Sequence, residues 1–128
     1  MSVTASLVGS VQLTDNVSGD TSLSKTVNST YTGTNSGFTQ SQLIGTSPVS
    51  LTLPGSPVQF LYLRNLATGI GANLTASWTP NGGSTQTVIT LAPGGMILFS
   101  ETNTSNGITA LSVTAALAAT PIEFILAA

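Results

Sequence analysis

Two glutamates, Glu101 and Glu123, are the residues of this 128-residue chain best suited to acid–base chemistry. The sequence contains no His and no Cys, so the commonest general base and the thiolate metal ligand are both missing. Two carboxyl groups at a suitable separation can act as general acid and general base. Glu101, however, ends one apolar segment and Glu123 lies inside another, without a surrounding cluster of aromatic and polar residues. We therefore predict no catalytic residue and no enzymatic activity.

Asp15 and Asp20 are close enough in sequence to share a cation. They bracket Asn16–Gly19, and oxygen ligands with a glycine between them are typical of calcium loops. The same residues are equally typical of a turn in which Asp and Asn side chains bond their own backbone. We favour the turn, and we predict neither a metal site nor a cofactor.

Arg64 is the one charged residue in the most apolar segment of the chain, Val58–Leu66. It shares the alternation of Tyr62, and a lone guanidinium among apolar side chains is costly unless it is paired. Glu123 and Glu101 are its candidate partners within the chain. We favour an intrachain pair or a position at the rim of a sheet, and a carboxylate of a neighbouring subunit is the alternative.

Three aromatic residues, Trp78, Tyr31 and Tyr62, are candidates for a platform on which a sugar stacks. Only 5% of the residues are aromatic, and Trp78 alternates in phase with Leu74 and Ala76. This phase favours a position in the core for Trp78 over a ligand-stacking role.

The charge content is low, with 5% charged residues and a net charge of -2. Two cations cannot form a phosphate-binding surface, so nucleic acid is excluded as a direct partner. A nearly neutral surface lacks the self-repulsion that keeps proteins apart, which favours assembly. The N-terminus has no basic, apolar signal sequence and no apolar run spans a bilayer, so we expect synthesis in the cytoplasm and no membrane partner.

The stretch Val58–Trp78 is the centre around which the other elements are expected to pack. Its first part, Val58–Leu66, is rich in large apolar residues on both faces and predicts a strand covered on both sides. Its second part, Asn73–Thr79, alternates and predicts a half-buried strand.

Alternation with period two continues through most of the chain, and turn residues separate the alternating segments. Further strands are predicted over Val3–Leu13, Leu23–Tyr31, Phe38–Ile44, Val49–Leu53, Thr85–Leu91, Met96–Ser100, Ile108–Ala115 and Ile122–Leu126. Eight to ten short antiparallel strands without helices predict a single all-β domain over residues 1–128, a β-sandwich of jelly-roll type. Residues 1–13 are either its first strand or an arm that adds a strand to a neighbour.

The second half of the chain resembles small virion structural proteins of tailed bacteriophages. The segments that carry the resemblance are Leu61–Asn65, Ser77–Gly83, Leu91–Gly95 and Pro121–Leu126. The likeness is one of composition and predicted structure: this chain and those proteins are rich in β-strands, Ser, Thr and Gly and lack Cys and His. No motif in it is specific to a reaction, so no functional residue is carried over.

This resemblance implies a structural component of a phage particle, and we expect a protein that decorates or cements the head. Its expected partners are further copies of itself, with a trimer favoured, and the major capsid protein, and its expected location is the virion. A carbohydrate- or receptor-binding module of a tail tip or fibre is the alternative, and a self-assembling fibre subunit is a variant of the first. A hydrolase that uses Glu101 and Glu123 is the least favoured.

Overall fold

The computed structural model describes residues 2–14 and 21–128. These ranges form ten β-strands, one 3-10 turn and no α-helix. The elements are β1 (Val3–Thr14), β2 (Thr21–Gly33), β3 (Ser36–Ile44), β4 (Val49–Ser50), β5 (Phe60–Asn65), β6 (Leu74–Pro80), β7 (Thr87–Leu91), β8 (Met96–Ser100), η1 (Thr104–Asn106), β9 (Ile108–Ala115) and β10 (Thr120–Ala127). The predicted all-β fold is confirmed. The turn or cation loop weighed for Asp15 and Asp20 lies outside the described residues.

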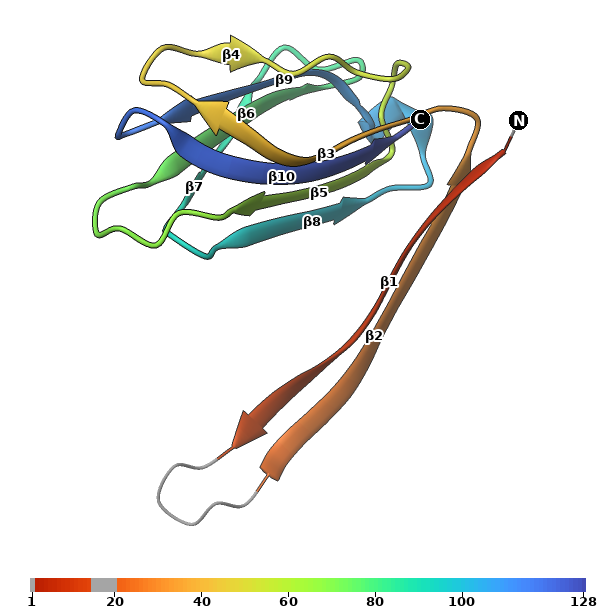
Figure 1. The fold of residues 1–128 in the computed structure, drawn as a ribbon. Helices are drawn as coiled ribbons and strands as arrows, with labels where there is room; N and C mark the ends of the chain where they lie inside the picture. Colours follow the sequence, from red (N-terminus) through yellow and green to blue (C-terminus); the bar gives the residue numbers. More distant parts are fainter. Residues whose placement is uncertain (1, 15–20) are drawn as a thin grey trace.

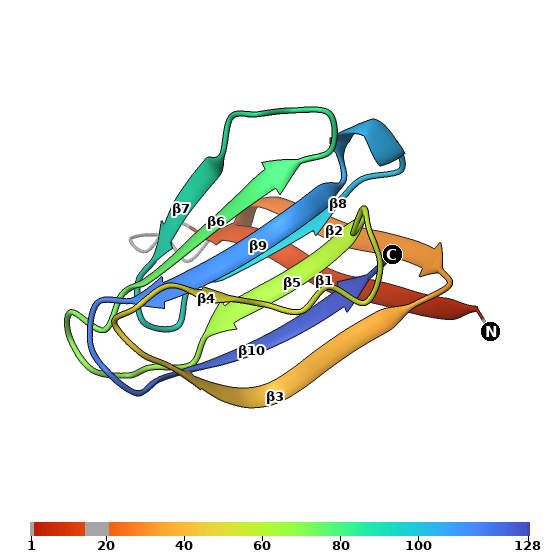
Figure 2. The same ribbon diagram turned by 90° about the horizontal axis from the view of Figure 1, so that it is seen from above.

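Strands β3 to β10 form a sandwich of two four-stranded antiparallel sheets (Figure 1). The strand order is β3–β10–β5–β8 in one sheet and β4–β9–β6–β7 in the other. The pairs are nested in the sequence, because β3 pairs with β10, β4 with β9, β5 with β8 and β6 with β7. Consecutive strands therefore alternate between the sheets, except for the β6–β7 hairpin (Figure 2).

The core lies between the two sheets and takes alternate residues from each strand. Leu61 and Leu63 of β5 are fully buried there, as is Leu74 of β6. Trp78 is 8% exposed, and its ring centre lies 6.4 Å from that of Phe99 at an angle of 58°. The predicted inward phase of Trp78 is confirmed, and each large core side chain contributes about 1.5–3 kcal/mol by its burial.

The prediction that β5 is covered on both sides is wrong for most of the strand. Phe60, at its start, is 3% exposed, but Tyr62 and Arg64, which follow it on the same side of the strand, are only half-buried. The reason is that the sandwich has two layers, so each sheet turns one face to the core and the other outward.

Asn65, at the end of β5, is a polar residue with no exposed surface. Its amide nitrogen Nδ2 donates to the carbonyl oxygens of Ala72, at 2.8 Å, and Leu91, at 3.2 Å, and its Oδ1 accepts from the backbone N–H of Ala67 at 3.0 Å. One side chain thus joins the loop that leaves β5 to the end of β7. Burial without these partners would be costly, so the site requires this amide.

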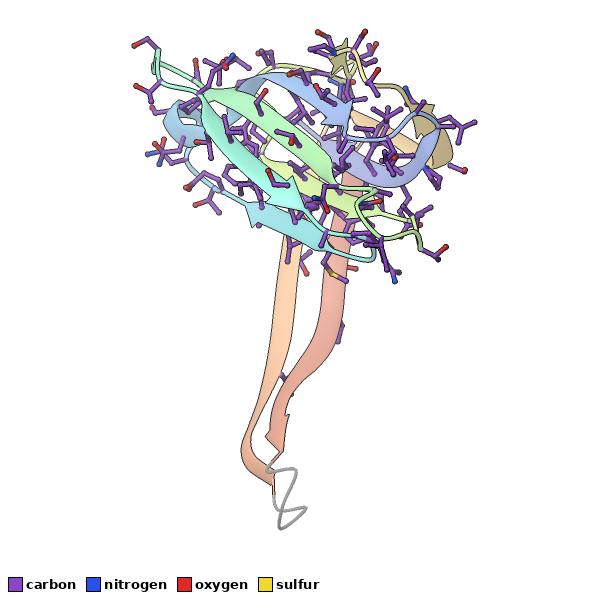
Figure 3. The ribbon with its side chains drawn as sticks, turned by 90° about the vertical axis from the view of Figure 1, so that its left-hand side faces the viewer. Carbon is purple, nitrogen blue, oxygen red and sulfur yellow. The ribbon has the colours of Figure 1, made fainter. Side chains whose placement is uncertain are left out.

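Strands β1 and β2 do not join the sandwich. They pair with each other in a long antiparallel hairpin, from Val3 opposite Gly33 to Thr14 opposite Thr21. The hairpin leaves the sandwich beside the C-terminus and extends away from it (Figures 1 and 3). At about 3.4 Å per residue, the 12 residues of β1 reach roughly 40 Å, about twice the length of β5.

Candidate assembly surface

The outward face of the β3–β10–β5–β8 sheet carries three of the predicted site residues, Tyr62, Arg64 and Glu123. The strand register aligns two rows across it, of which one contains Ile125, Tyr62 and Leu98 and the other Glu123, Arg64 and Met96. The "outer face" denotes these six residues together with Leu43 of β3. Met96 is 56% exposed and Ile125 42%, and Leu43 is also exposed. Four of the seven side chains are aliphatic, so the outer face is largely apolar.

A short polar cluster lies within the outer face. Arg64 and Glu123 are directly opposite each other on β5 and β10, and their Nη1 and Oε1 atoms are 3.9 Å apart. The Tyr62 hydroxyl donates to the same Glu123 oxygen at 2.6 Å. The Arg64 and Glu123 side chains are 43% and 29% exposed, so solvent screens the ion pair and it contributes little stability.

The pKa of Tyr62 is raised above its ordinary value of 10.0. Burial is the largest cause, and the hydrogen bond to Glu123 and the negative charge of that residue add to it, while Arg64 opposes them. The hydroxyl therefore stays protonated and keeps donating to Glu123 throughout the neutral range. The Tyr62–Glu123 hydrogen bond is therefore a fixed feature of the outer face at neutral pH.

Arg64 has one incompletely satisfied atom. Its Nε is buried and has no hydrogen-bond partner among the described residues. A buried donor without a partner costs stability in the isolated chain. The intrachain partner of Arg64 is Glu123, which is one of the two that the sequence suggested.

Glu101 lies at the other end of the sheet, and its proposed contact with Arg64 or Glu123 is wrong. Arg64 is opposite Met96 at the start of β8, whereas Glu101 follows the last residue of that strand, about 17 Å further along. Its carboxylate accepts from the backbone N–H of Asn103 at 2.9 Å and from the Asn106 side chain at 3.4 Å. The Asn103 bond is the main reason why the pKa of Glu101 is lowered. Glu101 therefore stabilises the loop that contains η1.

The three aromatic candidates for ligand stacking lie in three different places. Trp78 is in the core, Tyr62 is on the outer face, and Tyr31 is in strand β2 of the hairpin. The sandwich therefore separates Trp78 from Tyr62, and the structure does not bring these two into one platform.

The base of the hairpin covers one end of the sheet that carries the outer face. Strand β2 contacts β10 and β8, the strands on either side of β5. At that end Phe60 and Ala127 are paired and buried, although neither belongs to the core between the sheets. The backbone of the connection to β3 is held at the C-terminus, where the Thr34 and Asn35 N–H groups donate to the Ala128 oxygen at 2.8 and 3.1 Å.

The sequence did not single out the exposed residues of the outer face. Met96 and Ile125 are in apolar strands, and their exposure depends on which sheet face they occupy, which follows from strand pairing. The one available signal was Arg64, because a guanidinium that alternates with Tyr62 marks that side of β5 as partly exposed.

In the described ranges, no group of three or more acidic, His or Cys residues is arranged to hold a metal ion. None of the helical segments in those ranges is long and apolar enough to cross a bilayer. Comparison of the chain with protein-family models, with curated proteins and with solved structures gives no match.

Proposed function

We propose that this chain is a non-enzymatic structural subunit of a phage particle, and that it decorates or cements the head through contacts with copies of itself and with the coat lattice. The observation that carries the proposal is the β1–β2 hairpin, which extends roughly 40 Å from a sandwich that it contacts at its base. A two-stranded hairpin is only marginally stable in water by itself. An arm of this length therefore implies a second surface that covers it in the working state.

The strand order supports a jelly-roll assignment for the sandwich. Nested antiparallel pairs and alternation between two four-stranded sheets are the arrangement expected when one long hairpin rolls up. Jelly rolls are common in viral coat and lectin domains. A shared fold does not establish a function, so this is support by analogy, and the hairpin carries more weight.

The distribution of charge also supports an assembly role. The six formal charges of the chain leave most of its surface neutral, and the exposed side chains include large apolar ones such as Leu43, Met96 and Ile125. Surfaces of this kind associate without a repulsive barrier. On a particle, many copies would bury such surfaces at once.

The test is to locate the chain on purified particles. Particles from a lysate of the source strain are purified on a density gradient, the chain is quantified by mass spectrometry, and gold-labelled antibody against it is imaged by electron microscopy. We expect many copies per particle and labelling over the head. Absence from the particles would contradict the proposal, and labelling restricted to the tail, or filaments formed by the purified chain, would replace head decoration with a tail or fibre role.

A further inference from the structure

We infer that the β1–β2 hairpin of one copy of this chain lies on the outer face of a second copy. The inference deepens the proposed function and rests on it, because it names the surface and the partner through which the subunits associate. Four observations carry it: the pattern of the hairpin, the open end of the outer face, the anchored base of the hairpin, and the area available.

The hairpin has an apolar set of positions that the chain leaves without a covering sheet. In β1, apolar residues recur at alternate positions, and the register places Ala5 opposite Tyr31, Gly9 opposite Val27 and Leu13 opposite Leu23. Two positions of the same set in β2 are polar, namely Ser29 opposite Leu7 and Lys25 opposite Val11. The intervening positions that the structure describes are exposed and, Val8 apart, polar: Thr4, Ser6, Val8, Thr26, Thr30 and Thr32. This alternation is that of a strand pair with one face packed on an apolar surface.

The outer face supplies such a surface, and the hairpin base shows how it is used. Where the base contacts the sheet, the outward-facing Phe60 is 3% exposed. Further along the same strands, at the row of Arg64 and Met96, the outer face is open. One end of the outward face of this sheet is therefore already covered by the base of a hairpin, and the neighbouring part of the same face is uncovered.

The hairpin of the same chain does not cover the open end. It leaves the sheet at the covered end and diverges from it, as both side views show (Figures 1 and 3). Backbone hydrogen bonds hold the connection at its base, where Ala128 accepts from Thr34 and Asn35 and donates to the Asn35 oxygen at 3.0 Å. A hairpin held away from its own sheet is available to another copy.

The area available fits a small, reversible contact. The ribbon is about 10 Å wide, and β5 is only about 20 Å long, so the outer face can cover roughly 200 Å² of one hairpin. If each copy gives one hairpin and receives one, about 400 Å² per copy is covered, which is typical of a weak interface that repetition on a lattice reinforces. The described part of the hairpin carries a single charged residue, Lys25, which belongs to the apolar set opposite Val11. The outer face carries one charge of each sign, Arg64 and Glu123, so the contact offers Lys25 a carboxylate as well as a like charge.

The first test places a charge on the outer face of the full-length chain. Met96→Lys and Ile125→Lys alter exposed side chains and leave the core intact, and Val88→Lys, on β7 of the other sheet and 60% exposed in the wild type, is the matched control. A lysine buried against the apolar set of the hairpin is expected to weaken self-association at least ~10-fold in sedimentation experiments. Val88→Lys is expected to leave it unchanged. Equal effects of the three variants, or a wild-type chain that stays monomeric at every concentration, would overturn the inference.

The second test uses the absence of cysteine from the chain. Ser29→Cys places a thiol in the apolar set of the hairpin, and Met96→Cys places one on the outer face, with Val88→Cys as the control. Single-cysteine chains are mixed and treated with a short bismaleimide. We expect a covalent pair of chains from Ser29→Cys with Met96→Cys and none from Ser29→Cys with Val88→Cys.

Two results of the cross-linking would overturn the inference. One is the absence of any Ser29–Met96 product, and the other is a cross-link formed within a single chain that carries both cysteines at high dilution, which would mean that the hairpin folds onto its own sheet. The two proposals fail separately. If the chain is found on particle heads and Met96→Lys does not weaken its self-association, the proposed function stands and the docking is wrong. If the chain is absent from particles and Met96→Lys abolishes self-association, the docking stands and the proposed function is wrong.

Discussion

Replacement of Asn65 by alanine is expected to destabilise the sandwich more than any other loss of a polar side chain from its interior. The substitution removes three hydrogen bonds from a site with no exposed surface and leaves the carbonyl oxygens of Ala72 and Leu91 and the N–H of Ala67 without their partner. A buried hydrogen bond contributes about 1 kcal/mol net, and each group left unsatisfied costs about 1–3 kcal/mol more. Because water can enter the loop to satisfy some of these groups, we expect a loss of about 3–5 kcal/mol, a large part of the ~5–15 kcal/mol of a typical domain.

Urea denaturation monitored by Trp78 fluorescence measures this loss, since Trp78 is 8% exposed in the folded state. The midpoint should fall while the slope is unchanged. Asn81→Ala is the matched control, because that amide makes one exposed hydrogen bond, at 3.0 Å to the Thr104 oxygen, and its loss should cost no more than about 1 kcal/mol. Equal stability losses in the two variants would refute the role assigned to Asn65.

The isosteric variant Asn65→Asp separates hydrogen bonding from shape. The introduced carboxyl group would face two carbonyl oxygens in a buried site, so its pKa in the folded state is expected to lie above the unfolded value of about 3.9. A raised pKa means that stability is greatest below the unfolded value and is lost as the pH rises through the folded value. The stability of this variant relative to wild type should therefore fall from acidic to neutral pH, and a constant difference would contradict the geometry at this position.

Three further predictions concern other side chains. Tyr62→Phe removes the hydrogen bond to Glu123 and should lower the free energy of unfolding by about 1 kcal/mol in urea denaturation at neutral pH. Because the pKa of Tyr62 is raised above 10.0, this contribution is present below that pH and is lost as the pH rises through the pKa of the folded state. A difference in stability that persists in strong alkali would contradict this prediction. Glu101→Gln should speed amide hydrogen exchange at Asn103 at neutral pH. In the wild type, protection of this amide should persist below pH 4.5 and be lost as the pH falls through the lowered pKa of Glu101 in the folded state. Equal exchange rates in the two proteins would contradict this prediction. Trp78→Ala should destabilise by about 3–5 kcal/mol in thermal or urea unfolding, and a variant as stable as wild type would mean that the indole lies outside the core.

The fold class and the inward phase of Trp78 could be predicted because both depend on local alternation. Period two is visible along a single strand, and Leu74 and Trp78 lie on one side of theirs whatever the neighbouring strands are. The partners of a strand are not local. Arg64 has two candidate carboxylates in the sequence, and only the register of β5 with β10 and β8 selects Glu123 and places Glu101 at the far end.

The hairpin and Asn65 were harder to predict, for different physical reasons. Val3–Leu13 alternates as a strand of a sandwich does, so the pattern does not distinguish an arm that packs on another molecule from a strand that packs on its own core. Asn65 follows a run of apolar residues and precedes a loop, where an asparagine is most often a turn residue in solvent. Its burial depends on the Ala92–Gly95 turn, whose Gly94 and Gly95 exchange backbone hydrogen bonds with Asn65 from a distant part of the sequence.

The central claim is that this chain works by assembling with copies of itself, and the molar mass in solution tests it most directly. Light scattering of the full-length chain is measured at two concentrations in moderate salt. A closed oligomer, with a trimer favoured, whose mass does not change with salt is the predicted result, because the surfaces that meet are apolar and nearly neutral. A monomer at both concentrations would contradict it.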